Sequence, residues 1–98
     1  VRGTVRVINT GNTVWLAGAG TGHVRLGVQL LAPDGAVMER DFARYDLGGD
    51  VAEGVSLDVE MALTLPDGDR AFGLKLDLVD EDICWFEDVG SPALRVSV

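Results

Sequence analysis

The sequence predicts an all-β domain, built as a two-sheet antiparallel sandwich with Greek-key connections. Apolar residues alternate with a period of two in about six segments. Gly, Pro and Asp separate these segments, as turns between short strands require. In no segment do the apolar residues follow the spacing of a helix convincingly, so we expect about seven strands. An up-and-down barrel is the alternative, but a long middle loop and a closing strand after Gly-Ser-Pro favour the Greek key.

The first half of the chain predicts one strand and a hairpin. Residues 4–8 alternate and form the first strand. Residues 24–30 form the second, and Pro-Asp-Gly at 33–35 supplies a tight turn. The return strand at 36–42 is less regular and more charged, which is typical of a sheet edge that must not recruit another chain.

The second half predicts a crossing loop and three further strands. Residues 46–54 have three glycines and no apolar periodicity, so they should cross between the sheets. Residues 56–65 show the cleanest alternation and predict a core strand. A turn at 66–69 then leads to a strand at 72–79, and the chain closes with a strand at 94–98.

The strand at 72–79 carries the strongest fold signal. Phe72, Leu74, Leu76 and Leu78 fall on one side of an extended backbone, so the strand should be half buried. We expect Leu76 to be fully buried and central, because its neighbours on that face are also apolar. An acidic tip should follow, and then a second, aromatic strand.

Size and charge limit the class of protein. The 98 residues, 47% of them apolar, fit one domain over residues 1–98, which we expect to be a piece of a larger protein. The net charge of −8 argues against nucleic acid or an anionic membrane surface as partner. No run of about 18 apolar residues occurs, so no membrane-spanning helix is expected.

The chain has few residues that could act as a nucleophile or bind zinc. Cys84 is the only cysteine and His23 the only histidine. No internal disulfide or multi-cysteine zinc site can therefore form, and we expect Cys84 to be a small buried hydrophobe. Because Cys84 and His23 lie far apart on different predicted strands, a Cys-His pair is not expected. The sequence predicts no catalytic residue and no cofactor.

Other patterns favour ordinary structure over a site. The acidic residues at 80–82 lack the spacing and glycine of an EF-hand, which favours a solvated hairpin tip over a Ca²⁺ site. The glycines at 18–22 are not followed by a helix, so they predict a loop and no phosphate site. No Asp or Glu sits between bulky apolar neighbours on a core face, as the acid of a glycoside hydrolase would.

The aromatic residues are the candidate ligand contacts. Trp15, Tyr45 and Trp85 could stack on a sugar ring or on a partner's side chain, although at least one tryptophan should belong to the core. The Asn-Thr-Gly turn should deliver Trp15 toward one end of the sandwich. There Asn9 can bond its own backbone two residues on, and Gly11 can adopt a positive φ.

Three segments carry a resemblance to known modules. Residues 5–15, with the order Asn-Thr-Gly-x-x-x-Trp, resemble the entry of bacterial immunoglobulin-like domains, including cell-adhesion-related domains, and the tryptophan-containing domain of autophagy receptors. Residues 54–61 and 72–86 are similar to later strands of domains attached to bacterial glycosyltransferases and methyltransferases of surface polysaccharide synthesis. The chain departs from the commonest pattern at Phe72, where many relatives have Tyr.

The resemblance implies an accessory immunoglobulin-like domain. The expected function is a non-catalytic interaction module that contacts a neighbouring domain or a protein partner. A carbohydrate-binding module is the alternative, and a small acid-base enzyme is a more distant one. Aligned, exposed aromatic rings would favour a sugar, whereas an apolar patch without aligned rings would favour a protein partner.

Overall fold

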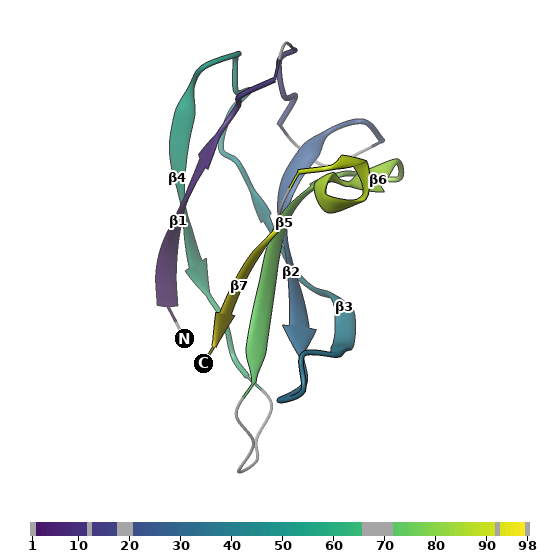
Figure 1. Cartoon of the computed structure of the whole chain (residues 1–98). Coiled ribbons are helices and arrows are strands. Elements are labelled where there is room, and N and C mark those ends of the chain that lie inside the picture. Colours follow the sequence, from purple (N-terminus) through teal and green to yellow (C-terminus); the bar gives the residue numbers. More distant parts are fainter. Residues whose placement is uncertain (1, 12, 18–20, 66–71, 92, 98) are drawn as a thin grey trace.

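The computed structural model describes residues 2–11, 13–17, 21–65, 72–91 and 93–97, which form two antiparallel sheets facing each other (Figure 1). The predicted all-β class is confirmed. The described residues contain seven strands: β1 (Arg2–Ile8), β2 (Val24–Leu31), β3 (Val37–Asp46), β4 (Ser56–Ala62), β5 (Gly73–Asp80), β6 (Cys84–Trp85) and β7 (Leu94–Ser97). A 3₁₀ helix, η1 (Phe86–Val89), follows β6.

The two sheets differ in size. β1 and β4 form a two-stranded sheet. The other sheet has the order β3-β2-β5, and both β6 and β7 pair with β5, on different stretches of that strand. β1 and β7 belong to different sheets but lie beside each other in Figure 1.

The core fills the space between the sheets. Val7 and Val59 face inward from the small sheet, and Leu26 and Leu74 from the large one. The alternation predicted for β5 is confirmed for its apolar side: Leu76 retains 3% of its exposure and belongs to this core. Burial of these apolar side chains is the main source of the fold's stability.

The hairpin and its charged edge strand are also confirmed. β3 is the outermost strand of its sheet, and its first five residues are exposed. Irregular register between β2 and β3 near Leu30 twists this edge, a common protection against unwanted pairing. The strand runs to Asp46, beyond the predicted end at Phe42, because Tyr45 and its neighbours still pack on the core and pair with β2.

A buried asparagine ties the first turn to the crossing loop. Asn9 is fully buried, and its Nδ2 donates to the carbonyl oxygens of Thr13 at 2.7 Å and Val51 at 2.8 Å. Its Oδ1 accepts the predicted bond from the Gly11 N–H at 3.0 Å. The prediction of a positive φ at Gly11 is wrong, because the Gly11 backbone lies outside the left-handed region.

The crossing loop connects β3 to β4, as predicted, but it is not purely polar. Leu47 and Val51 retain 5% and 0% of their exposure and complete the core. The loop bonds to the first turn through a reciprocal backbone pair between Val51 and Trp15, with both N···O distances 2.9 Å.

The outer face of the large sheet is less solvated than the alternation predicts. Gly27 and Gln29 on β2 and Asp77 on β5 are all buried, although they point away from the core. The segment after β5 folds back over this face, so the strand at 72–79 is covered on both sides along part of its length. The turn predicted at 66–69 lies outside the described residues, as does most of the glycine-rich stretch at 18–22.

Candidate functional site

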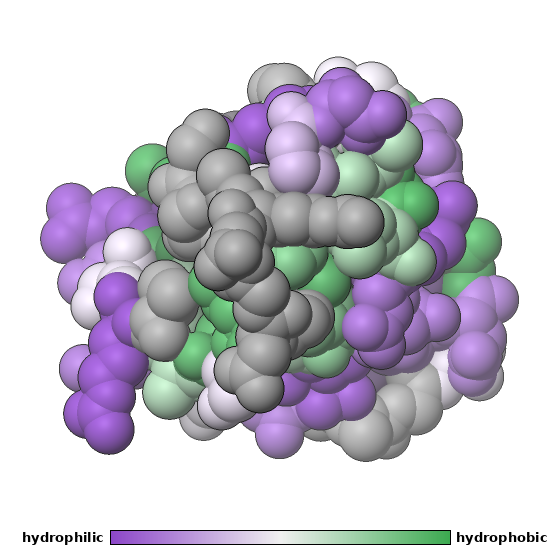
Figure 2. Space-filling model, turned by 90° about the horizontal axis from the view of Figure 1, so that it is seen from below, coloured by the Kyte–Doolittle hydropathy of each residue, from purple (hydrophilic) through white to green (hydrophobic). Residues whose placement is uncertain are grey.

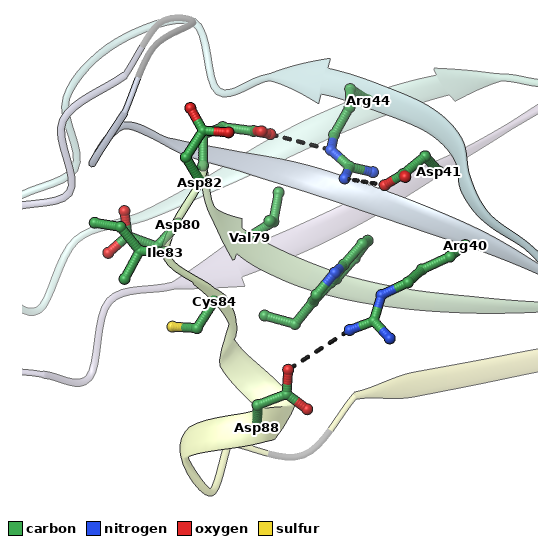
Figure 3. A pocket seen from close by; sticks show the side chains of 11 residues that line it. Arg40, Asp41, Arg44, Val79, Asp80, Asp82, Ile83, Cys84 and Asp88 are labelled. Carbon is green, nitrogen blue, oxygen red and sulfur yellow. Dashed lines mark hydrogen bonds and ion pairs between the residues drawn. The ribbon is translucent and has the colours of Figure 1, made fainter.

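An open groove of about 530 Å³ lies on the outer face of the large sheet, around Trp85 (Figure 3). Two arginines of β3 form one side of the groove, and the turn between β5 and β6 forms the other. We call it the Trp85 groove. Besides Trp85, its walls comprise Arg40, Asp41, Arg44, Val79, Asp80, Glu81, Asp82, Ile83, Cys84 and Asp88.

A glycine fixes the position of the Trp85 ring. Trp85 is 8% exposed and lies close enough to β2 that a Cβ added to Gly27 would stand 2.6 Å from its Cη2 atom. Carbon atoms prefer about 3.5 to 4.0 Å, so only glycine leaves room for the ring here. The predicted aromatic strand β6 is therefore confirmed, and its tryptophan is a structural part of the outer face.

Two arginines cover the Trp85 ring. The guanidinium carbon of Arg44 lies 4.6 Å from the ring centroid and that of Arg40 lies 5.6 Å from it. Arg44 also pairs with Asp41 at 2.6 Å and with Glu81 at 3.0 Å. The Arg44 side chain is only 19% exposed, and its ion pair with Glu81 joins β3 to the β5–β6 turn.

The acidic tip is solvated only in part: Asp82 is exposed, as predicted, whereas Asp80 and Glu81 are half-buried. Glu81 is held by Arg44, and Asp82 accepts a hydrogen bond from the Thr21 hydroxyl at 2.9 Å. Asp82 also adopts a left-handed backbone with φ 61°, which Asp tolerates better than most residues. Glu81 and Asp82 therefore have separate partners, and the buried Oδ1 of Asp80 has no hydrogen-bond partner among the described residues. Among the described residues, no group of three or more His, Cys, Asp or Glu could hold a metal ion.

A second polar unit lies under η1. Asp77 is 6% exposed and accepts the Glu87 backbone N–H at 2.8 Å, while the Lys75 ammonium pairs with the Glu87 carboxylate at 2.7 Å. Burial raises the pKa of Asp77, and the backbone N–H bonds from Glu87 and Leu78 oppose that shift. The arrangement anchors η1 to β5.

Cys84 and His23 do not form a nucleophilic pair in the described structure. Cys84 is half-buried, and desolvation raises the pKa of its thiol, with the charge of Asp80 adding to the effect. Such a thiol stays protonated at neutral pH, unlike an activated nucleophile. His23 Nδ1 is buried and has no hydrogen-bond partner among the described residues, so no acceptor orients the imidazole.

The three candidate aromatics are not brought together. The Trp15 ring meets the Phe86 ring edge-on, with centroids 5.6 Å apart. Tyr45 packs on the core and its hydroxyl donates to the Ala62 carbonyl oxygen at 2.9 Å, which links β3 to β4. Trp85 lies on the outer face under its arginines. The three rings therefore form no shared platform.

A narrow apolar hollow opens between the two sheets, along β1 and β7. One part, of about 200 Å³, is lined mainly by Val5, Met61, Leu63, Leu74, Leu76, Leu94 and Val96. A second part, of about 180 Å³, shares Val5, Leu76 and Leu94 with the first and continues the opening. We call the two together the β1–β7 seam. From the end where β1 begins and β7 ends, Figure 2 shows apolar side chains amid hydrophilic ones.

The seam leaves inward-facing residues of β7 exposed. Leu94 pairs with Leu76 and Val96 with Leu74, so each pair shares the inner face of the sheet. Leu74 and Leu76 are buried, whereas Leu94 is 53% and Val96 42% exposed. No strand within the described residues covers β7 from the small sheet, although the predicted closing strand itself is confirmed.

Comparisons with protein-family models, curated proteins and solved structures find no match for this chain. Within the described residues, no helix has the length and apolar character needed to cross a membrane.

The sequence did not predict the residues that shape the Trp85 groove and the β1–β7 seam. The pairing of Arg44 with Trp85 links residues far apart in the chain and has no local signal. Gly27 interrupts a strand pattern, which can indicate close approach of another group, and that signal was present. The exposure of Leu94 and Val96 could not be read from alternation, because alternation gives the face and not what covers it.

Proposed function

We propose that this chain is a non-catalytic interaction module with an immunoglobulin-like sandwich fold, which contacts a neighbouring domain or a protein partner through the β1–β7 seam. One observation carries the proposal: Leu94 and Val96 face inward on β7 and yet remain 53% and 42% exposed. Aliphatic side chains on the core side of a sheet are normally covered, and contiguous exposed ones mark interaction surfaces.

Strand pairing supports the immunoglobulin-like assignment. In that fold, strands B and E pair in one sheet, and strands C, F and G follow one another in the other. β1 and β4 correspond to the first pair, and β2, β5 and β7 to the second series. The resemblance of residues 5–15, 54–61 and 72–86 to bacterial immunoglobulin-like modules points the same way. On that resemblance, the partner enzyme would act in surface polysaccharide synthesis as a glycosyltransferase or methyltransferase.

A protein contact fits the surface better than a sugar. Sugar platforms need exposed rings in alignment, but Trp15 packs on Phe86, Tyr45 bonds Ala62, and Trp85 lies under arginines. The exposed groups at the seam are aliphatic. A carbohydrate-binding module is the second candidate, carried only by the Trp85 groove, whose ring is 8% exposed.

Side-chain footprinting in cells tests the proposal even while the partner is unidentified. Carbene labelling of the purified chain should modify Leu94 and Val96 readily. In cells that contain this protein, labelling of both should fall, while Val37 on the opposite edge of the sheet and Val89 on η1 keep theirs. Equal labelling of Leu94 and Val96 in the two settings would contradict a contact at the seam.

A glycan array tests the alternative. We expect no glycan to bind with a dissociation constant below about 1 mM. Any hit is titrated against Trp85→Leu, with Tyr45→Phe as the matched control because it keeps a ring. Submillimolar binding that disappears only in Trp85→Leu would favour the carbohydrate-binding module, and turnover of any substrate would contradict both candidates.

A further inference from the structure

We propose that the β1–β7 seam receives an extended strand of a partner protein in which apolar residues alternate with acidic ones, and that this strand pairs with the free edge of β1. The inference rests on the proposed function and specifies the partner's form and charge. It concerns the recognition mode, which the exposure of Leu94 and Val96 alone does not define.

Backbone geometry provides the pairing edge. Of the described strands, β1 pairs only with β4, and β7 pairs only with β5. The other edge of β1 therefore offers unpaired N–H and C=O groups at the border of the seam. An extended peptide that adds to such an edge gains main-chain hydrogen bonds, which is a common form of peptide recognition.

The apolar floor matches the side-chain period of a strand. Every second residue of an added strand points to the same face. The inward residues would meet Val5 on one side and Leu94 and Val96 on the other, all of which are at least partly exposed. β1 has seven residues, so a segment of about that length, roughly 23 Å when extended, spans the seam.

Charge selects the remaining residues of the partner strand. β1 and β7 carry Arg2, Arg6 and Arg95 and no acidic residue, in a chain of net charge −8. Arg6 already pairs with Asp58, whereas Arg2 and Arg95 have no ion pair among the described residues. Arg2 borders the seam, so acidic side chains on the outward face of the added strand would lie beside it.

A second copy of this chain is the less favoured occupant. Two copies of net charge −8 repel each other at low ionic strength. A partner strand with alternating acidic residues gains local attraction to Arg2 without requiring two whole acidic domains to meet. Light scattering of the purified chain distinguishes the two cases, and a dimer that protects Leu94 would overturn the proposal.

The probe is a synthetic seven-residue peptide in which Val and Glu alternate, blocked at both ends. Isotope-labelled protein is titrated with it and followed by amide chemical shifts. We expect a dissociation constant below about 1 mM, with shifts concentrated in β1 and β7. Three comparison peptides should bind at least about tenfold more weakly: one with Lys in place of Glu, one with the apolar residues grouped together, and one N-methylated along the pairing edge.

Substitutions in the protein test whether the peptide binds at the seam. Leu94→Asp should weaken binding of the Val-Glu peptide at least about tenfold, and Val37→Asp, at a similarly exposed strand position, should leave it unchanged. Arg2→Glu should reverse the preference between the Glu and Lys peptides. Both Asp variants lie at exposed positions, and their amide spectra verify that each one is folded.

Three results would overturn the strand-addition proposal: no binding of the Val-Glu peptide, equal binding of the N-methylated peptide, or insensitivity to Leu94→Asp. If footprinting in cells still shows Leu94 covered, the interaction module stands and only this recognition mode falls. If Leu94 is also uncovered in cells, both proposals fail together.

Discussion

Replacing Gly27 with alanine tests how the outer face of the large sheet is built. The added Cβ would lie 2.6 Å from Trp85 Cη2 and 3.3 Å from a guanidinium nitrogen of Arg44. The ring must move by roughly 1 Å to regain normal contact distance. Such overpacking costs about 1 to 3 kcal/mol, and partial loss of the Arg44 contact adds about 0.5 to 1 kcal/mol.

Repeating Gly27→Ala in a Trp85→Leu chain tests whether the Trp85 ring causes the loss of stability. The smaller leucine side chain leaves room for the added methyl group. Alanine is then favoured over glycine in a strand interior by about 0.5 to 1 kcal/mol, so the same substitution should become neutral or stabilising. The coupling free energy between positions 27 and 85 should therefore exceed about 1.5 kcal/mol.

Urea unfolding of the four chains of this cycle provides the measurement, with near-ultraviolet circular dichroism as a check on ring packing. A Gly27→Ala effect that is the same in both backgrounds, within about 0.5 kcal/mol, would refute the reasoning. The glycine would then be needed for its backbone and not for the ring.

Three further predictions concern the core, the buried carboxylate and metal. Leu76→Ala should lower the free energy of unfolding by about 2 to 5 kcal/mol, and a loss under about 1 kcal/mol would mean that the β5 register is wrong. Burial raises the pKa of Asp77 above 3.8, so the folded chain holds this proton more tightly than the unfolded chain. The stability contributed by the protonated group is therefore complete below pH 3.8 and is lost as pH rises through the raised pKa. Relative to Asp77→Asn, the unmodified chain should lose stability over that window in urea titrations, and a relative gain would contradict the shift. Thermal unfolding should give the same midpoint with chelator and with millimolar Ca²⁺, because the acidic residues at 80–82 lack EF-hand spacing and the described residues contain no group of His, Cys, Asp or Glu that could hold a metal ion. A midpoint raised by Ca²⁺ would instead reveal an ion site.

Strand identity was predictable because it depends on a local period. The alternation at 72–79 gave the strand, its apolar face and the burial of Leu76, and the charged segment at 36–42 gave the edge. The length of β3 was underestimated, because residues after Phe42 are held by pairing with β2 and by core packing. Those contacts join distant parts of the chain and leave no periodic signal.

The surfaces were less predictable than the strands. The acidic tip was expected to be solvated, yet Glu81 is fixed by Arg44 from another strand. The three candidate aromatics were read by residue type, and the structure assigns Trp15 and Tyr45 to packing within the fold. Exposure of Leu94 depends on what lies across from β7, which a one-strand pattern does not contain.

The openness of the seam is the claim on which the proposed function depends, and methyl NMR measures it most directly. A soluble paramagnetic cosolute relaxes methyl groups according to their solvent exposure. We predict that the methyl groups of Leu94 and Val96 relax nearly as strongly as those of Val89, while those of their strand partners Leu74 and Leu76 remain protected. Leu94 and Val96 protected to the same degree as Leu74 would show a closed sandwich with no surface for a partner at the seam.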